Sequence, residues 1–161
     1  MPGLFKLYDH AVLGLATLAG ASTAFMTIAI IVDVILRNLG FHPFQWTSAV
    51  VEYLLLFIAM GAGPWLLRVG GHVAISSFVD KLPPGPGLFV KRMVIVVSAF
   101  VLGWLAWRAA AIGAHEFSIT STDIRSINIP GWVAYAMLAA GFALMGIETL
   151  RLLAGRERDA S

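Results

Sequence analysis

The sequence predicts an all-α membrane protein with four transmembrane helices and a short amphipathic helix in its middle loop. Of its 161 residues, 59% are hydrophobic and only 12% are charged, and the mean hydropathy is +0.85. Soluble domains usually carry about 45–50% apolar and about 25% charged residues, so this chain has too few charges to cover a small soluble fold. The composition excludes an ordinary soluble enzyme, a disordered segment and a freely soluble nucleic-acid-binding protein.

Four apolar stretches are long enough to cross a bilayer, which takes roughly 20 residues of helix. We expect these spans at about residues 11–36, 47–67, 90–114 and 129–150, within a single domain that covers residues 1–161. Each helix then satisfies its own backbone hydrogen bonds, as hydrocarbon requires. Cysteine is absent, which excludes disulfides, thiolate metal sites and cysteine nucleophiles.

A cleaved signal peptide is the competing interpretation of the first span. Lys6 precedes the apolar stretch, and the small residues at 20–24 resemble a cleavage site. The apolar stretch continues beyond them through residue 31, whereas a cleaved signal has a short apolar core. We therefore expect an uncleaved first span.

Most of the basic residues fall on one side of the predicted membrane. Four spans place both termini and the middle loop on the same side, which leaves only Arg37, Arg108 and Arg125 on the other. The positive-inside rule then predicts cytoplasmic termini in an inner (plasma) membrane, with Trp46 near the outer boundary. The eight basic residues on the terminal side are Lys6, Arg68, Lys81, Lys91, Arg92, Arg151, Arg156 and Arg158.

The middle loop contains a segment with helical periodicity. Ile75, Phe78, Val79 and Leu82 recur at i, i+3, i+4 and i+7, so they share one face of a helix. The segment is too short to span, and we expect a helix over about 73–82 that lies in the membrane interface. It covers the protein's own helices or docks a partner subunit, and the sequence leaves both alternatives open.

Acidic residues within the spans are the first functional candidates, because a charge in hydrocarbon is costly. Asp33 precedes Arg37 by four residues, which favours a local ion pair over a transport role. Glu52 lies about 9 Å inward from Trp46 at 1.5 Å per residue. We expect Glu52 to face a helix interface and pair with a polar group or cation there, with snorkelling as the alternative. Glu148, near the end of the last span, is expected to be solvated.

The sequence offers no set of residues for catalysis or for a cofactor. A membrane bundle that holds haem needs two histidines at similar depth, but His10, His42, His72 and His115 all lie at span ends or in loops. A small multidrug exporter would carry an acid in its first span, and residues 11–32 contain none. We therefore expect no enzyme activity, no cofactor and no bound metal.

Helix packing is the remaining signal. Small residues recur every fourth position in Ala16–Gly20–Ala24, Ala59–Gly63 and Ala136–Ala140, and such rows let helices approach closely in lipid. The run 61–64 (Gly-Ala-Gly-Pro) predicts a kink in the second span, which we favour over an ion site made of freed carbonyls. The rows exceed what one minimal bundle needs, so the chain is expected to lie against helices of a partner.

Three local motifs occur in order along most of the chain. They are residues 34–38 (VILRN) with 44–47 (FQWT), residues 67–73 (LRVGGHV) with 78–83 (FVDKLP), and residues 127–132 (INIPGW). In this order and spacing they resemble the small membrane subunit of tripartite ATP-independent periplasmic (TRAP) transporters. The chain departs from that pattern at Glu52, where the family commonly has a basic residue.

The resemblance implies a non-catalytic scaffold subunit of a sodium-coupled importer of organic acids. Family members pair with a large membrane subunit that carries the substrate and sodium sites, and a periplasmic binding protein delivers the substrate. The alternative is an accessory helical subunit of another membrane complex, such as an electron-transfer or light-harvesting complex. The candidate subunit-contact or structural residues are Asp33, Arg37, Trp46, Glu52, Arg68, Gly71, His72 and Pro130.

Overall fold

The computed structural model describes residues 2–41, 46–69, 84–119, 122–124 and 128–158. Four helices are long and apolar enough to cross a membrane, which confirms the predicted fold class. The amphipathic helix expected at 73–82, together with Gly71 and His72, lies outside the described residues. The elements are α1 (Pro2–Asn38), α2 (Thr47–Val69), α4 (Pro84–Ser118), β1 (Thr122–Ile124), β2 (Asn128–Pro130) and α5 (Trp132–Arg158).

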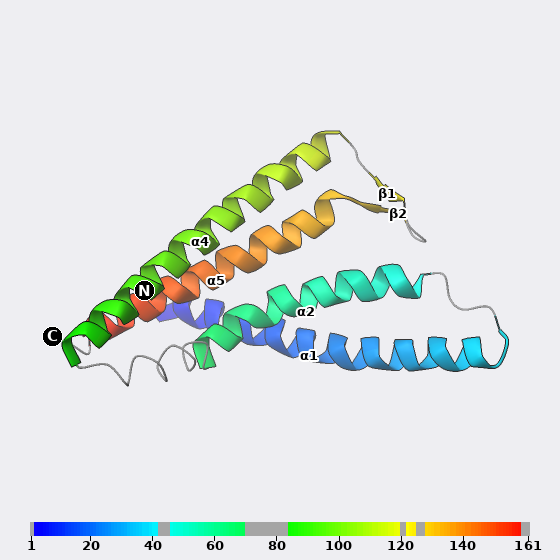
Figure 1. The fold of residues 1–161 in the computed structure, drawn as a ribbon, viewed down its shortest axis with the longest axis horizontal. Helices are drawn as coiled ribbons and strands as arrows, with labels where there is room; N and C mark the ends of the chain where they lie inside the picture. Colours follow the sequence, from blue (N-terminus) through cyan, green and yellow to red (C-terminus); the bar gives the residue numbers. More distant parts are fainter. Residues whose placement is uncertain (1, 42–45, 70–83, 120–121, 125–127, 159–161) are drawn as a thin grey trace.

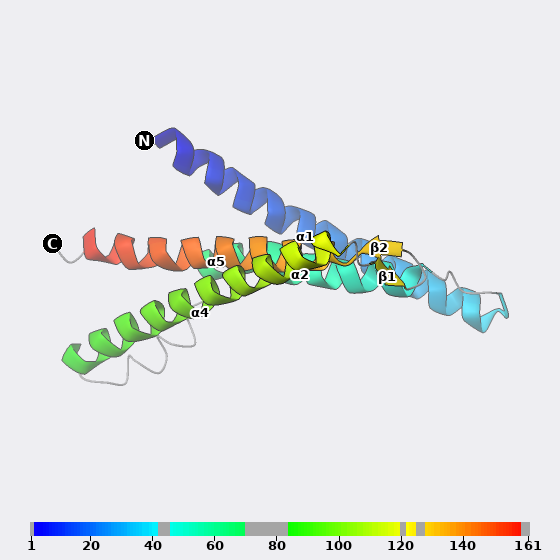
Figure 2. The same ribbon diagram turned by 90° about the horizontal axis from the view of Figure 1, so that it is seen from above.

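The four helices pack as an open row in the order α1, α2, α5, α4 (Figures 1 and 2). Helix α1 packs on α2, α2 packs on α5, and α5 packs on α4, so α1 and α4 form the two edges. Even in the span of α5, where burial is greatest, only 22% of the residues are buried. Most of the apolar surface is therefore left for lipid or for helices of another subunit.

The row consists of two antiparallel hairpins that meet near the chain termini. Helices α2 and α5 run parallel and contact each other there, whereas the opposite ends of the hairpins are splayed apart (Figure 1). We call the first region, around Tyr8, Arg68 and Arg151, the termini end. The second, where α1 leads to α2 and α4 leads to α5, is the hairpin end.

The α1–α2 contact follows a heptad pattern. The least exposed residues of α1 alternate in steps of three and four, which is the pattern of two helices that wrap around each other at a shallow angle. The predicted row Ala16–Gly20–Ala24 lies beside this contact, and its residues Gly20 and Ala24 are exposed. These less exposed residues are Val12, Leu15, Ala19, Ser22, Met26, Ala29 and Asp33.

Glycines bring α2 and α5 together through two reciprocal contacts with methionine. A Cβ on Gly141 would lie 2.6 Å from Cβ of Met60, and a Cβ on Gly63 would lie 2.7 Å from Sδ of Met145. Both distances are too short for a side chain to be added without displacing its neighbour. Helix α2 is continuous through Pro64, which is buried, and ends at Val69.

Two helix starts differ from those the sequence predicts. The last span was expected from about residue 129, but Pro130 ends strand β2, where it pairs with Thr122, and α5 begins at Trp132. A three-residue strand carries too little sequence signal to be recognised, and proline is tolerated at the end of such a short pairing. Helix α4 begins at Pro84, before the span expected from about residue 90, because proline fits the first helical position, where no donor is needed.

Candidate functional site

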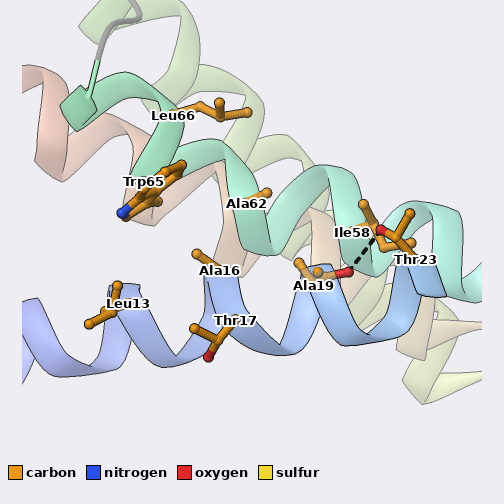
Figure 3. Close-up of a pocket in the computed structure, with 10 residues that line it drawn as sticks. Leu13, Ala16, Thr17, Ala19, Thr23, Ile58, Ala62, Trp65 and Leu66 are labelled. Atoms are coloured by element: carbon orange, nitrogen blue, oxygen red, sulfur yellow. Dashed lines mark hydrogen bonds between the residues drawn. The ribbon is translucent and has the colours of Figure 1, made fainter. Parts of the chain in front are cut away.

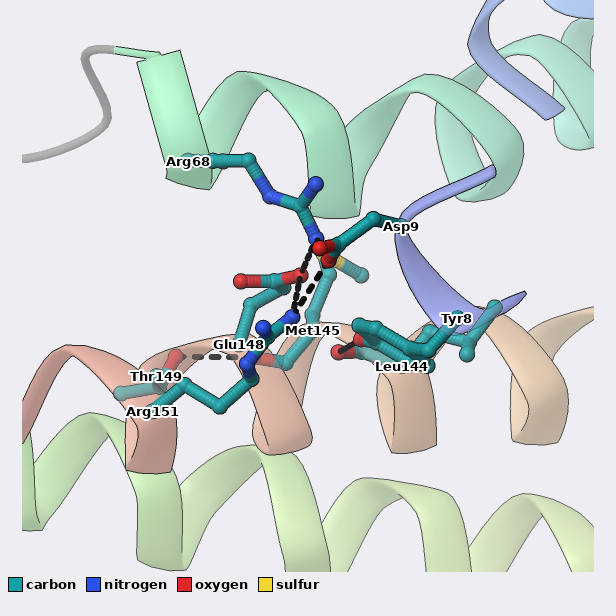
Figure 4. Close-up of polar contacts among 8 residues, drawn as sticks. All are labelled: Tyr8, Asp9, Arg68, Leu144, Met145, Glu148, Thr149 and Arg151. Carbon is teal, nitrogen blue, oxygen red and sulfur yellow. Dashed lines mark hydrogen bonds and ion pairs between the residues drawn. The ribbon is translucent and has the colours of Figure 1, made fainter. Parts of the chain in front are cut away.

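Four charged side chains join three helices at the termini end (Figure 4). Arg68 of α2 lies 3.0 Å from Oδ1 of Asp9 in α1, and it also donates to Glu148 of α5. Arg151 of α5 lies 2.9 Å from the same Asp9 oxygen and 3.4 Å from Oε1 of Glu148. We call these four residues the charged cluster; its two acids and two bases balance.

Glu148 is the most deeply placed member of the charged cluster. Its side chain is only 4% exposed, whereas those of Arg68 and Asp9 are 31% and 41% exposed. The expectation that Glu148 is solvated is therefore wrong. The parallel packing of α2 on α5 places Arg68 against it, although the two residues are 80 positions apart. A buried carboxylate is stable only when it is paired and hydrogen-bonded in this way.

Tyr8 adds a second connection between α1 and α5. Its hydroxyl donates to the carbonyl oxygen of Leu144 over 3.3 Å. The guanidinium carbon of Arg151 lies 5.1 Å from the centre of the Tyr8 ring, and that of Arg68 lies 6.0 Å away, within range of cation–π attraction. The first helix is thus held to the last one, although α2 and α4 lie between them in sequence.

Sequence reasoning identified only Arg68 of this cluster as a candidate. A usable signal was present: two acids and two arginines all lie within the end turns of spans that the topology brings to one side. That signal gives no pairing, because it does not say which helices are neighbours. The row order supplies the pairing.

The hairpin end has a simpler polar contact. Nη2 of Arg37 lies 3.3 Å from Oδ2 of Asp33, which confirms the predicted local ion pair. Asp33 faces α2 and is 8% exposed, whereas the side chain of Arg37 is 69% exposed. Oδ1 of Asp33 and Oγ1 of Thr47 are buried without a hydrogen-bond partner in the described part of the chain. Trp46 lies one residue before α2 and is 38% exposed.

Glu52 lies where the two hairpins diverge. It lines a hollow of about 420 Å³ together with Tyr53, Leu55 and Leu56 of α2 and Ala134 of α5. The side chain is exposed in the single chain. Glu52 therefore lies beside the α2–α5 contact, and its pairing with a cation across a helix interface stays a prediction.

An apolar hollow of about 310 Å³ lies between α1 and α2 (Figure 3). Ala16 and Gly20 of α1 line one side, and Ala62 and Trp65 of α2 line the other. The hydroxyl of Thr23 donates to the carbonyl of Ala19 over 2.9 Å, so it is already satisfied within its own helix. The hollow thus offers apolar surface for a lipid chain or a helix and little for a polar solute.

Among the described residues, no group of three or more His, Cys, Asp and Glu side chains is arranged to hold a metal ion. His10 lies in α1 at the termini end and His115 lies in α4 at the hairpin end, so these two do not form a pair. His42 and His72 lie outside the described residues. The geometry that is described consists of helix contacts and ion pairs.

Four apolar spanning helices in an open row define this chain as a multi-pass membrane protein. Residues 26–158 match the family described as tripartite ATP-independent periplasmic transporters, DctQ component, and the chain belongs to that family. It is 24% identical over 135 residues to a Haemophilus influenzae protein, and the match covers 81% of this chain and 80% of that relative. The relative's name, which was given by inference, is TRAP transporter small permease protein. No solved structure matches the chain.

Proposed function

We propose that this chain is the non-catalytic scaffold subunit of a sodium-coupled TRAP transporter that imports organic acids. In this proposal a large membrane subunit carries the substrate and sodium sites, and a periplasmic binding protein delivers the substrate. The observation that carries the proposal is the family match over residues 26–158 in a chain whose spans form an open row. A row with two broad apolar faces provides a platform against which a larger membrane subunit can be held.

The hollows support a scaffold role rather than a transport path within this chain. The hollow between α1 and α2 is lined almost entirely by apolar surface, and it lies on the flank of a helix contact. A smaller void of about 120 Å³, where α2 meets α5, is lined by apolar residues and Gly61 and Gly141. A solute carrier needs polar groups or broken helices near the middle of the membrane, and the proposal assigns these to the large subunit.

The proposed orientation places the termini end in the cytoplasm. Two arginines of the charged cluster, Arg68 and Arg151, lie at that end, and the positive-inside rule favours their location there. The hairpin end then faces the periplasm, from which the binding protein delivers its substrate. Accessibility of single cysteines to a membrane-impermeant thiol reagent tests this, since the chain has no cysteine of its own.

Co-purification and reconstitution test the proposed function. We expect an affinity-tagged copy of this chain to retain a large membrane subunit encoded beside it. Proteoliposomes with both subunits and the binding protein should take up an organic acid when sodium is applied outside. Equal uptake by the large subunit alone, or a chain that purifies stably without that subunit, would contradict the proposal.

The visible spectrum of the purified complex separates the alternative. A TRAP transporter is expected to be colourless, because no step of the proposed transport uses a pigment. An absorption band in the visible range that copurifies with this chain would favour an accessory subunit of an electron-transfer or light-harvesting complex.

A further inference from the structure

Arg108 lies deep within the span of α4. The span extends from Arg92 to Ser118, and the residues at 93–107 and 109–114 carry no charge. At 1.5 Å per residue, Arg108 lies about 15 Å from the Ser118 end and about 24 Å from the Arg92 end. The hydrocarbon of a bilayer is about 30 Å thick, so the arginine is attached well inside it. The expectation that Arg108 belongs with the basic residues on the far side of the membrane is corrected by this position within the span.

Arg108 also points away from its own chain. The face of α4 that packs on α5 includes Ile95, which is 1% exposed, and Ala109, which is 7% exposed. The opposite face is exposed, with Phe100 and Trp104 at 71% and 54%, and Arg108 lies one turn beyond Trp104 on the same stripe. None of the described residues forms an ion pair with Arg108, and α4 lies at the edge of the row (Figure 2).

A guanidinium at this depth requires acceptors, and the described residues form no ion pair with it. Arginine has five N–H donors and stays charged, and lipid chains offer no acceptor. Charged groups within spans therefore face other helices and pair there. The 27-residue span is about 39 Å long at 1.5 Å per residue, so when it is centred on about 30 Å of hydrocarbon, Arg108 lies about 10 Å from the nearer edge. That is farther than an extended arginine side chain reaches, which argues against a lipid headgroup as the acceptor.

The composition of the exposed stripe also fits a protein partner. Arginine and tryptophan are the residues most enriched at the energetically dominant positions of protein interfaces. On α4 they lie together, with the ring centres of Trp104 and Trp107 5.2 Å apart. Arg108 follows directly after Trp107, so a large apolar contact area adjoins a single charge.

We propose that this face of α4, formed by Val97, Phe100, Trp104 and Arg108, docks a transmembrane helix of the large subunit, and that Arg108 pairs with a carboxylate on that helix. The inference rests on the proposed function, because it names the contact by which the two subunits join. The docked helix extends the row beyond α4. The pairing neutralises the arginine in the same way that Asp9 and Glu148 together neutralise the two arginines of the charged cluster.

Retention of the large subunit by charge variants tests the pairing. With both subunits co-expressed and this chain tagged, Arg108→Glu is expected to retain at least tenfold less large subunit than the wild-type chain, and Arg108→Lys to retain more than Arg108→Glu. Arg92→Glu is the matched control, since Arg92 is exposed at the start of the same span and should retain the wild-type amount. Wild-type retention by Arg108→Glu, or an equal loss in Arg92→Glu, overturns the proposal.

Site-specific cross-linking keeps the inference testable if Arg108→Glu fails to fold. The absence of native cysteine allows Trp104→Cys to carry a benzophenone maleimide while Arg108 is intact. We expect photolysis to join this position to the large subunit in higher yield than Leu18→Cys, which is exposed on α1 at the other edge of the row. Adducts to phospholipid alone, or an equal or higher yield from Leu18→Cys, overturn the assignment of the docking face.

The two proposals fail in different ways. If the wild-type chain retains no large subunit, the proposed function fails. If the wild-type chain and Arg108→Glu retain it equally, and Trp104→Cys gives no adduct with it, only the docking face is wrong.

Discussion

The two ends of the helix row are held together by different interactions. At the termini end, three helices share a charged cluster, and the side chain of Glu148 is 4% exposed within it. At the hairpin end, the ion pair of Asp33 and Arg37 lies within one helix, and the side chain of Arg37 is 69% exposed. The termini end therefore fixes helices relative to one another, whereas the polar contact at the hairpin end supports only its own helix.

This difference explains where the row is narrow and where it is open. Lipid provides no hydrophobic drive between helices, so close packing and polar contacts decide which helices associate. The glycine–methionine contacts and the charged cluster both lie along the part of α2 that contacts α5. Toward the hairpin end a hollow beside Glu52 replaces these contacts. The surface of this hollow is left for lipid or a partner subunit.

The largest expected effect comes from removing the buried acid of the charged cluster. Glu148→Gln leaves Arg68 and Arg151 with only the partly exposed Asp9 as counter-ion. Removing one partner of a buried ion pair costs about 3 kcal/mol or more, and we expect a loss of this size in the free energy of unfolding. Titration with sodium dodecyl sulfate in mixed micelles, followed by circular dichroism, measures it.

Asp9→Asn is the matched control within the same cluster. Its side chain is 41% exposed, so water already screens its charge, and its loss should be clearly smaller. A loss for Glu148→Gln no larger than that for Asp9→Asn would show that the buried acid does not hold the termini end together.

The next largest effect is expected where α2 and α5 approach most closely. Gly141→Ala places a methyl group 2.6 Å from Cβ of Met60, an atom held by the backbone. The helices must separate slightly, and overpacking of this kind costs about 1–3 kcal/mol. Gly63→Ala should cost less, because its Cβ would meet the flexible end of Met145. The same detergent titration measures both.

Gly103→Ala is the control for helix propensity, since nothing lies within 4 Å of its added Cβ. It should leave stability unchanged or raise it by up to about 1 kcal/mol, because alanine favours a helix over glycine. If Gly141→Ala has the same free energy of unfolding as Gly103→Ala, α2 and α5 do not approach each other closely at Gly141.

Sequence reasoning recovered the features that depend on one helix at a time. The four spans follow from the length of apolar residues that a bilayer requires, and the Asp33–Arg37 pair follows from the i, i+4 spacing on one helix. Glu148 was misplaced because its burial depends on α2 lying beside α5 (Figure 4). The sequence does not distinguish a charged residue near the end of a span that is solvated from one that pairs with an arginine 80 positions away.

The packing order of the helices was likewise beyond the sequence. Small residues on three spans predicted close helix packing without identifying the partner helix, and the row on α1 lies beside the α1–α2 contact rather than in it. Gly63 does make a close contact, with Met145, but the fourfold spacing that singled it out carries no information about its partner. The strand pairing of Pro130 with Thr122 depends on only three residues on each side, too few for a periodic signal.

A smaller effect, on assembly rather than on folding, is expected at Glu52. Because Glu52 is exposed in the single chain, Glu52→Ala should lower the free energy of unfolding of the isolated subunit by less than Glu148→Gln does. If Glu52 pairs across a helix interface, its removal should weaken the complex by about 1 kcal/mol, near the scale of polar contacts between membrane helices. Thermal dissociation of the purified complex measures this, and unchanged assembly would count against the pairing.

The smallest effect is expected for Arg37→Gln at the hairpin end. An i, i+4 ion pair whose arginine is largely exposed contributes about 0.3–0.5 kcal/mol, and glutamine keeps a donor near Asp33. The detergent titration should therefore place this variant close to the wild-type chain and well above Glu148→Gln. A loss as large as that of Glu148→Gln would mean that the 3.3 Å contact between Arg37 and Asp33 also holds α1 against α2. In that case both ends of the row would be fixed between helices, and the opening between the hairpins would need another cause.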